Sequence, residues 1–173
     1  MHLPKYLLSA LTLAVVTATA CDRAPTSSIK PSAPSFATNV STVCKGSTVP
    51  TGYVILSYFN HYTCGPYGSY PNAMSIGLPA SPETICESSP IPSGRVITSY
   101  GRSYNCDPYS VTSSSFKNTN TIKIPTATYE YVCDGSPIPS NYTTTTYQYY
   151  TSSCDRYSEG YKGWSNAREI RKV

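Results

Sequence analysis

The chain has 173 residues, of which 39% are hydrophobic and only 13% are charged, and its net charge at pH 7 is +4. So small a positive balance argues against a nucleic-acid-binding protein, which usually gathers basic residues on one face. Seven cysteines and 17 tyrosines beside a single tryptophan predict a fold held by cross-links and aromatic packing rather than by a large aliphatic core.

Residues 1–20 have the organisation of a secretory signal peptide. A short start containing Lys5 precedes an apolar run from Leu7 to Val16, and small residues follow up to Ala20. The apolar run is too short to cross a bilayer as a helix. We therefore expect this segment to be removed, and it is excluded from the fold.

The residues around the expected cleavage site carry a lipidation signal. The segment Ala18-Thr19-Ala20-Cys21 resembles the lipobox of bacterial lipoproteins, although Ala18 stands where that family favours Leu. The resemblance implies that the Cys21 thiol is diacylglycerated, that the chain is cut before it, and that a lipid holds the protein at a membrane of the cell envelope. Ala18 and Ala20 also fit the A-x-A pattern of simple secretion, so a secreted protein is the alternative.

Cysteine parity favours lipidation of Cys21. Seven cysteines in an exported protein would leave one odd thiol, whereas acylation of Cys21 leaves six that can all pair. Residues 21–42, which begin with this cysteine, are rich in Pro, Ser, Ala and Thr and show no apolar period. We therefore expect a lipidated cysteine followed by a flexible tether.

The six remaining cysteines form three pairs with separations of 20, 20 and 21 residues. Other residues recur in step with them, among them a serine and a proline that follow each first cysteine. Repetition on this scale predicts three copies of one unit, spanning residues 43–84, 85–131 and 132–173. Each copy is expected to close its own disulfide. The predicted pairs are Cys44–Cys64, Cys86–Cys106 and Cys133–Cys154.

Each copy contains two runs typical of β-strands. A run rich in Val, Ile, Thr and Tyr follows a proline turn, and a second run carries the pattern Asn-x-x-x-Ile. No helical period is present, so the predicted fold is all-β, with three tandem disulfide-closed β-hairpin or meander repeats. We favour a linear stack of these repeats, with closure round a pseudo-threefold axis as the alternative. The predicted strands are Tyr53–Phe59, Arg95–Tyr100 and Tyr142–Tyr150, with Ser75–Leu78, Thr121–Ile124 and Glu169–Val173.

Two details of the unit follow from its middle copy and from its tyrosines. Gly101 and Arg102 fit a two-residue hairpin turn, which would place the second cysteine of the copy on the returning strand. Tyrosines recur at matching places in the copies, and a repeated column predicts packing in the core. The repeated tyrosines are Tyr58, Tyr100 and Tyr147, followed by Tyr67, Tyr109 and Tyr157.

The sequence offers little for catalysis or metal binding. His61 is the one histidine outside the signal segment, and its place at a predicted hairpin tip indicates an exposed loop residue. Acidic residues directly follow four cysteines of the second and third copies, which predicts solvated charges beside the bridges. The cysteines are too far apart for a zinc site, so we expect no catalytic residue, no metal and no cofactor. The four acids are Glu87, Asp107, Asp134 and Asp155.

Aromatic side chains outside the repeated columns are the best candidates for ligand binding. Exposed rings among Ser, Thr and Asn can stack on sugars or contact a protein partner. Basic residues near the C-terminus are expected to form a solvated edge. The candidate binding residues are Tyr62, Tyr70, Tyr104, Tyr149, Tyr150, Tyr161 and Trp164.

Together these features predict a non-enzymatic cell-envelope lipoprotein with a structural or adhesive role. Its expected partners are the membrane, through the lipid, and a glycan or an envelope protein, whereas export and low net charge argue against nucleic acid. Two other classes are open. A secreted disulfide-rich protease inhibitor would present a rigid loop such as Ser89–Gly94, and a small hydrolase would use His61 with neighbouring acids.

Overall fold

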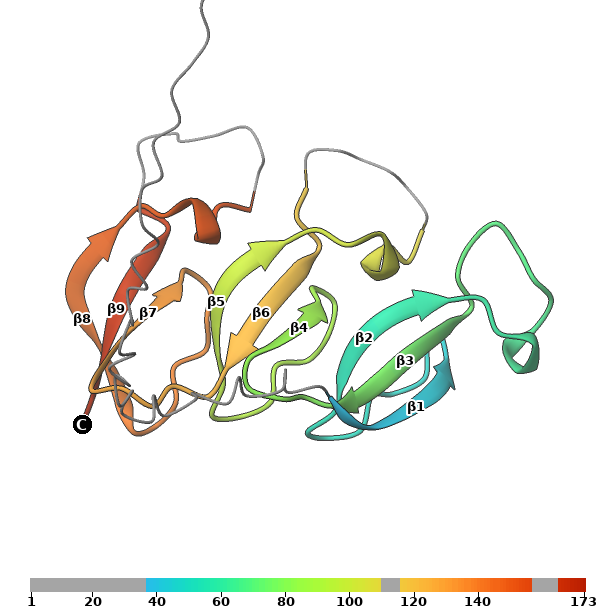
Figure 1. The fold of residues 1–173 in the computed structure, drawn as a ribbon, viewed down its shortest axis with the longest axis horizontal. Helices are drawn as coiled ribbons and strands as arrows, with labels where there is room; N and C mark the ends of the chain where they lie inside the picture. Colours follow the sequence, from blue (N-terminus) through green and yellow to red (C-terminus); the bar gives the residue numbers. More distant parts are fainter. Residues whose placement is uncertain (1–36, 110–115, 157–164) are drawn as a thin grey trace, which may run out of the picture. The chain divides into compact units, whose positions relative to one another are not determined.

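The computed structural model describes residues 37–109, 116–156 and 165–173, and within them every regular element is a β-strand or a short 3-10 helix. The nine strands form three antiparallel sheets, in the orders β1-β3-β2, β4-β6-β5 and β7-β9-β8 (Figure 1). The prediction of an all-β fold is confirmed. The strands are β1 (Thr38–Cys44), β2 (Val54–Phe59), β3 (Ala73–Leu78), β4 (Glu83–Cys86), β5 (Val96–Gly101), β6 (Thr119–Lys123), β7 (Tyr129–Cys133), β8 (Tyr142–Tyr149) and β9 (Ala167–Lys172).

Each sheet corresponds to one copy of the sequence repeat, but its first strand begins before the predicted start of that copy, at Thr38, Glu83 and Tyr129. The strand with the Asn-x-x-x-Ile pattern lies in the middle, between the strand that ends at the first cysteine and the strand that follows the proline turn. The isoleucine of the pattern is buried in all three copies, as Ile76, Ile122 and Ile170. A β-branched apolar side chain suits this central, buried position on a pleated sheet.

The strands that end at the first cysteines are not among the predicted ones. β1 begins at Thr38, inside the segment expected to be a tether, and its first five residues are exposed. An exposed edge strand of mostly polar residues shows no apolar alternation, so periodicity does not reveal it. Residues 1–36, with Cys21 and most of that tether, lie outside the described residues. The described part of the chain contains no helix of the length and hydropathy needed to cross a membrane.

The disulfides pair within copies as predicted, with Cα–Cα distances of 5.2, 5.0 and 5.1 Å. The predicted returning strand was wrong, because each second cysteine instead ends a short 3-10 helix. Gly101 ends β5, and the Ser103 hydroxyl caps the following helix by accepting the Asn105 N–H at 3.2 Å. His61 and Thr151 cap the other two helices in the same way. The helices are η1 (Tyr62–Cys64), η2 (Tyr104–Cys106) and η3 (Ser152–Cys154).

In each copy, the side chain of the asparagine in the Asn-x-x-x-Ile pattern hydrogen-bonds to the backbone of the residue that caps the 3-10 helix. Asn118 accepts the Ser103 N–H through Oδ1 and donates from Nδ2 to the Ser103 carbonyl, both at 2.9 Å. Asn166 makes the same two bonds with Thr151, also at 2.9 Å. In the first copy, Asn72 accepts the His61 N–H at 2.7 Å. One amide side chain thus replaces the backbone partners that are lost where the strand gives way to the 3-10 helix.

Consecutive repeats are joined at a β-bulge. The register of β2 shifts just after Ile55, and the Ile55 N–H donates to Ser89 Oγ of the next repeat at 2.8 Å. The register of β5 shifts just after Ile97, and the Ile97 N–H donates to Ser136 Oγ, also at 2.8 Å. The repeated serine therefore satisfies a backbone donor that the bulge leaves without a partner in the ladder.

The disulfide of each following repeat packs against the same strand. The Cys86–Cys106 bridge shares a buried cluster with Ile55, and the Cys133–Cys154 bridge shares one with Ile97. β2 lies against β4 and β5 lies against β7 (Figure 1). In the described residues, the hydrogen bonds between repeats join consecutive repeats. This is the order of contacts expected of repeats that stack in sequence.

The repeated tyrosines do not share one environment, and their prediction as core residues was wrong for three of the five that the structure describes. Tyr100 is buried, with 6% of its surface exposed, and Tyr58 is half-buried. Tyr67, Tyr109 and Tyr147 are exposed, and Tyr157 lies outside the described residues.

The register of β8 explains why Tyr147 differs. The third copy has one extra residue between its cysteines, and β8 accommodates it in an irregularity between Thr144 and Gln148. Gln148 therefore occupies the place that Tyr58 and Tyr100 hold in the first two sheets. Counting the same number of residues from the first cysteine of each copy therefore selects Tyr147 in the third copy, one residue before the structurally equivalent Gln148.

Candidate binding site

Four tyrosines gather on the β7-β9-β8 sheet, and we call them the aromatic patch: Tyr129, Tyr131, Tyr147 and Tyr149. Exposed and buried residues alternate along β7, so Tyr129 and Tyr131 lie on its exposed face while Glu130 between them is buried. Tyr129, Tyr131 and Tyr147 have exposed fractions of 49%, 51% and 55%. Tyr149 is half-buried and packs on the core cluster beneath, so it forms the base of the patch.

Three of the four rings, those of Tyr131, Tyr147 and Tyr149, contact one another. The Tyr131 and Tyr149 ring centroids are 5.1 Å apart with their planes at 75°, an edge-on contact. The Tyr147 and Tyr149 rings are stacked, with centroids 5.9 Å apart. Arg171 lies over the Tyr129 ring at 5.7 Å from its centroid. Mutual contacts of this kind fix ring orientation, so the patch presents its exposed ring surface with little conformational entropy to lose on binding.

One polar group borders the patch. Glu169 lies opposite Tyr131 on β9, whereas Gln148 pairs with Arg168 and therefore lies on the other face of the sheet. Partial desolvation, and then the charge and hydrogen bonding of the Glu169 carboxylate, raises the pKa of the half-exposed Tyr131. Burial, followed by the neighbouring Tyr131 and Tyr147, raises the pKa of Tyr149. These two phenols therefore stay neutral, as hydrogen-bond donors, beyond the usual range of tyrosine.

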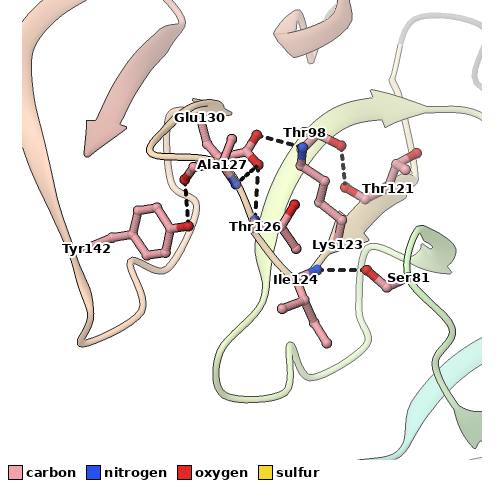
Figure 2. Close-up of polar contacts among 9 residues, drawn as sticks. All are labelled: Ser81, Thr98, Thr121, Lys123, Ile124, Thr126, Ala127, Glu130 and Tyr142. Atoms are coloured by element: carbon pink, nitrogen blue, oxygen red, sulfur yellow. Dashed lines mark hydrogen bonds and ion pairs between the residues drawn. The ribbon is translucent and has the colours of Figure 1, made fainter. Parts of the chain in front are cut away.

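A buried carboxylate anchors the strand that carries half of the patch. Glu130 Oε2 lies 2.6 Å from Lys123 Nζ, and Glu130 Oε1 accepts the Thr126 and Ala127 N–H groups at 3.2 Å each (Figure 2). The Tyr142 hydroxyl donates to the Ala127 carbonyl at 2.8 Å (Figure 2). The residues that connect β6 to β7 are thereby closed into a tight turn around Glu130.

Acid is expected to loosen this turn. Burial raises the pKa of Glu130, but the hydrogen bonds from Lys123, Ala127 and Thr126 together with the Lys123 charge outweigh it, so the pKa lies below its usual value. A carboxyl whose pKa is lowered by folding stabilises the protein above its unfolded-state pKa, and that stability is lost as pH falls through the folded-state pKa. Thermal unfolding between pH 6 and 2 should show this loss. The Glu130→Gln variant should be less stable at pH 6 and show a shallower acid dependence, whereas an unchanged pH profile would contradict this account of the turn.

The candidate residues chosen from the sequence fall into separate groups. Tyr62, Tyr70 and Tyr104 are exposed, but they belong to the loops of the first two repeats. In the described residues no ring contact joins them to the aromatic patch. Tyr149 belongs to the patch, and Tyr150 donates to Asp155 Oδ2 at 3.2 Å. Tyr161 and Trp164 lie outside the described residues.

Sequence reasoning missed three members of the patch. Tyr147 was assigned to the core by its column, and Tyr129 and Tyr131 were assigned no role. The signal was present in the alternation Tyr129-Glu130-Tyr131-Val132, which places two tyrosines on one face of a strand and a valine on the other.

The residues considered for catalysis have local structural roles. His61 Nδ1 is 2.7 Å from the Thr63 hydroxyl, and the His61 ring stacks on Tyr62 at 4.7 Å. Glu87 pairs with Arg156 at 3.3 Å, and Asp107 Oδ1 accepts the Tyr109 N–H at 2.9 Å. No group of three potential metal ligands occurs among the residues that the structure describes.

The loop considered for protease inhibition is used in packing. Ser89 is buried, with 6% of its surface exposed, and its hydroxyl accepts the Ile55 N–H. Pro90 to Ser93 line one side of a hollow of about 490 Å³, and Val49 to Tyr53 line the other. These lining residues include no acidic or basic side chain and no histidine, so they offer a ligand no ionic contact.

A second hollow lies between the second and third repeats. Its volume is about 240 Å³, and its lining includes Tyr100, Asp134 and Arg156. Arg156 lies over the Tyr100 ring at 4.5 Å from the centroid, and Tyr100 donates to the Asp134 carbonyl at 2.7 Å. These contacts hold the two repeats together, so the hollow is a feature of the junction.

Comparison with known proteins does not assign this chain to a family. No protein-family model, curated protein or solved structure matches this chain. The candidate site therefore rests on the geometry of the aromatic patch.

Proposed function

We propose that this chain is an exported, non-enzymatic lipoprotein of the cell envelope, and that its aromatic patch binds a glycan. The observation that carries the proposal is the set of exposed rings of Tyr129, Tyr131 and Tyr147 around the half-buried Tyr149. Flat aromatic surfaces stack on the apolar faces of sugar rings, and the bordering Glu169 can hydrogen-bond sugar hydroxyls. An open surface of this kind suits a polymer better than a small substrate, which usually requires a concave pocket.

Three disulfides support the export part of this proposal. Cross-links of this kind form and persist in oxidising compartments outside the cytosol. The lipid anchor is supported by the lipobox-like segment ending at Cys21 and by cysteine parity. Two or more acyl chains on Cys21 would hold the repeats stably at a membrane, whereas a single chain binds only marginally.

The anchor has a direct chemical test. Intact-mass spectrometry of the protein purified from its host should give a chain that begins at Cys21 and carries diacylglycerol with or without an N-acyl chain. A Cys21→Ser variant, which leaves the six paired cysteines unchanged, should lose the added mass and leave the membrane fraction. An unmodified Cys21 in the purified protein would contradict the anchor, and it would leave the glycan proposal untouched.

The patch has a separate test on glycan arrays that include peptidoglycan fragments and envelope polysaccharides. Each stacked ring is worth roughly 0.5 to 1.5 kcal/mol, so the Tyr131→Ala and Tyr147→Ala variants should each bind about two- to tenfold more weakly. Tyr67→Ala is the matched control, because Tyr67 is also an exposed tyrosine but belongs to the first repeat. Absence of any glycan ligand, or an equal loss in the Tyr67→Ala variant, would contradict the assignment.

A further inference from the structure

The face that each repeat offers to the preceding one has the same composition three times. We call it the receiving face: an apolar residue before the first cysteine, the disulfide, the repeated serine and an apolar residue after that serine. In the second repeat these residues are Ile85, Cys86–Cys106, Ser89 and Ile91; in the third they are Val132, Cys133–Cys154, Ser136 and Ile138; in the first they are Val43, Cys44–Cys64, Ser47 and Val49.

Two of the three receiving faces are occupied. Ser89 and Ser136 are buried, with exposed fractions of 6% and 4%, and each accepts a backbone N–H from the preceding repeat at 2.8 Å. The cysteines of both repeats are buried as well. In each case the occupant is the edge of an extended strand that carries a bulge and two consecutive β-branched apolar residues, Val54-Ile55 or Val96-Ile97.

The third receiving face, on the first repeat, has no occupant among the residues that the structure describes. Ser47 is exposed, and Val43, Val49 and the Cys44–Cys64 bridge are only half-buried. These are the same chemical groups that bind a strand edge in the other two repeats. The chain thus displays a site whose ligand chemistry is already demonstrated twice within the same molecule.

We propose that the receiving face of the first repeat binds an edge strand of a partner protein, one that carries two adjacent β-branched apolar residues at a bulge. In the two occupied junctions the strands belong to separate sheets, and the contact consists of one main-chain N–H that donates to the serine together with the packing of the apolar pair. The unpaired N–H of the partner donates to Ser47 Oγ, and its apolar pair covers Val43 and the Cys44–Cys64 bridge. The site is separate from the aromatic patch and does not depend on the glycan proposal.

A second copy of this chain does not supply the required strand. β2 and β5, which carry Val-Ile pairs, are both engaged within the chain. The corresponding residues of β8 are Thr143 and Thr144, both exposed. Burying two threonine hydroxyls against valine and a disulfide leaves polar groups without hydrogen-bond partners, which is unfavourable. The edge of the third repeat is therefore polar, while the apolar receiving face of the first repeat is uncovered within the described part of the chain.

The probe is a synthetic peptide with the sequence of residues 51–60, TGYVILSYFN, which contains the natural occupant from β2. Added to the isotopically labelled chain from Cys21 to Val173, it should give saturable amide shifts in NMR at Val43, Ser47 and Val49. The Ser47→Ala chain should bind the peptide about fivefold more weakly, from the loss of one hydrogen bond of about 1 kcal/mol. Thr48→Ala, at the neighbouring exposed residue, is the matched control and should bind normally.

A second peptide tests the chemistry of the occupant. It carries threonine at the positions of Val54 and Ile55, which copies the Thr143-Thr144 pair, and it should lose saturable binding. The proposal is overturned if the first peptide gives no saturable shift at millimolar concentration, if both peptides bind equally, or if the shifts fall on the third repeat. Concentration-dependent self-association in sedimentation that is abolished by Ser47→Ala would also overturn it, since the occupant would then be a second copy.

Discussion

Excess reductant is expected to unfold the repeats at room temperature. Closing a loop of about 20 residues stabilises a protein by on the order of 3 kcal/mol in the chain-entropy model, and this chain closes three such loops. A typical domain has a net stability of roughly 5 to 15 kcal/mol. The buried aliphatic core is small, so we expect it to be too weak to keep the repeats folded once the disulfides are reduced. Far-UV circular dichroism and protease resistance with and without reductant measure the effect.

The three bridges should not be equivalent. Replacing Cys133 and Cys154 by serine removes a loop constraint and also puts hydroxyls into a buried cluster with Ile97. Replacing Cys44 and Cys64 removes a similar constraint at a half-exposed place, so it should lower the denaturant midpoint less. Retention of the native spectrum and of protease resistance under full reduction would contradict the dependence on disulfides.

Replacing Val96 and Ile97 by threonine is expected to uncouple the third repeat from the second. The change copies the Thr143-Thr144 pair of β8 into β5. It removes two fully or nearly fully buried apolar side chains and buries hydroxyls in their place, which should cost roughly 4 kcal/mol in total. The loss falls on one junction, so urea unfolding should separate into two transitions, with β7, β8 and β9 exchanging their amide hydrogens first.

The control variant changes Thr143 and Thr144, the pair in β8 that corresponds to Val96 and Ile97 in β5. Replacing Thr143 and Thr144 by serine should leave the urea midpoint nearly unchanged, because both residues are exposed. A single cooperative transition with an unshifted midpoint in the Val96→Thr, Ile97→Thr variant would mean that the valine-isoleucine pair does not join the repeats.

Much of the fold could be predicted because the signals that define it repeat. The cysteine spacing and the Asn-x-x-x-Ile pattern each occur three times. Each cysteine pair closes one loop with a disulfide. Each Asn-x-x-x-Ile pattern supplies an asparagine side chain that hydrogen-bonds to the backbone, followed by a buried isoleucine. Their recurrence allowed the copies, the pairing and the central strands to be derived without any relative.

The features that were missed depend on tertiary environment rather than on residue type. β1 is an exposed edge with almost no apolar signal, and the 3-10 helices arise from caps and an asparagine clamp that sequence spacing does not reveal. The serine column was visible in the sequence, but its role appeared only when Ile55 and Ile97 were found to donate to it across repeats. Tyrosine gave the least reliable prediction, because its ring and hydroxyl suit a core, a junction or a surface equally well.

The most direct test of the functional account is an NMR titration of the chain from Cys21 to Val173 with the best glycan found on the arrays. The account predicts that ring-proton shifts and intermolecular contacts concentrate on Tyr129, Tyr131, Tyr147 and Tyr149, and that the rings of Tyr62, Tyr67 and Tyr104 are unchanged. Contacts on the first two repeats in place of the aromatic patch, or no intermolecular contact at saturating glycan, would contradict it.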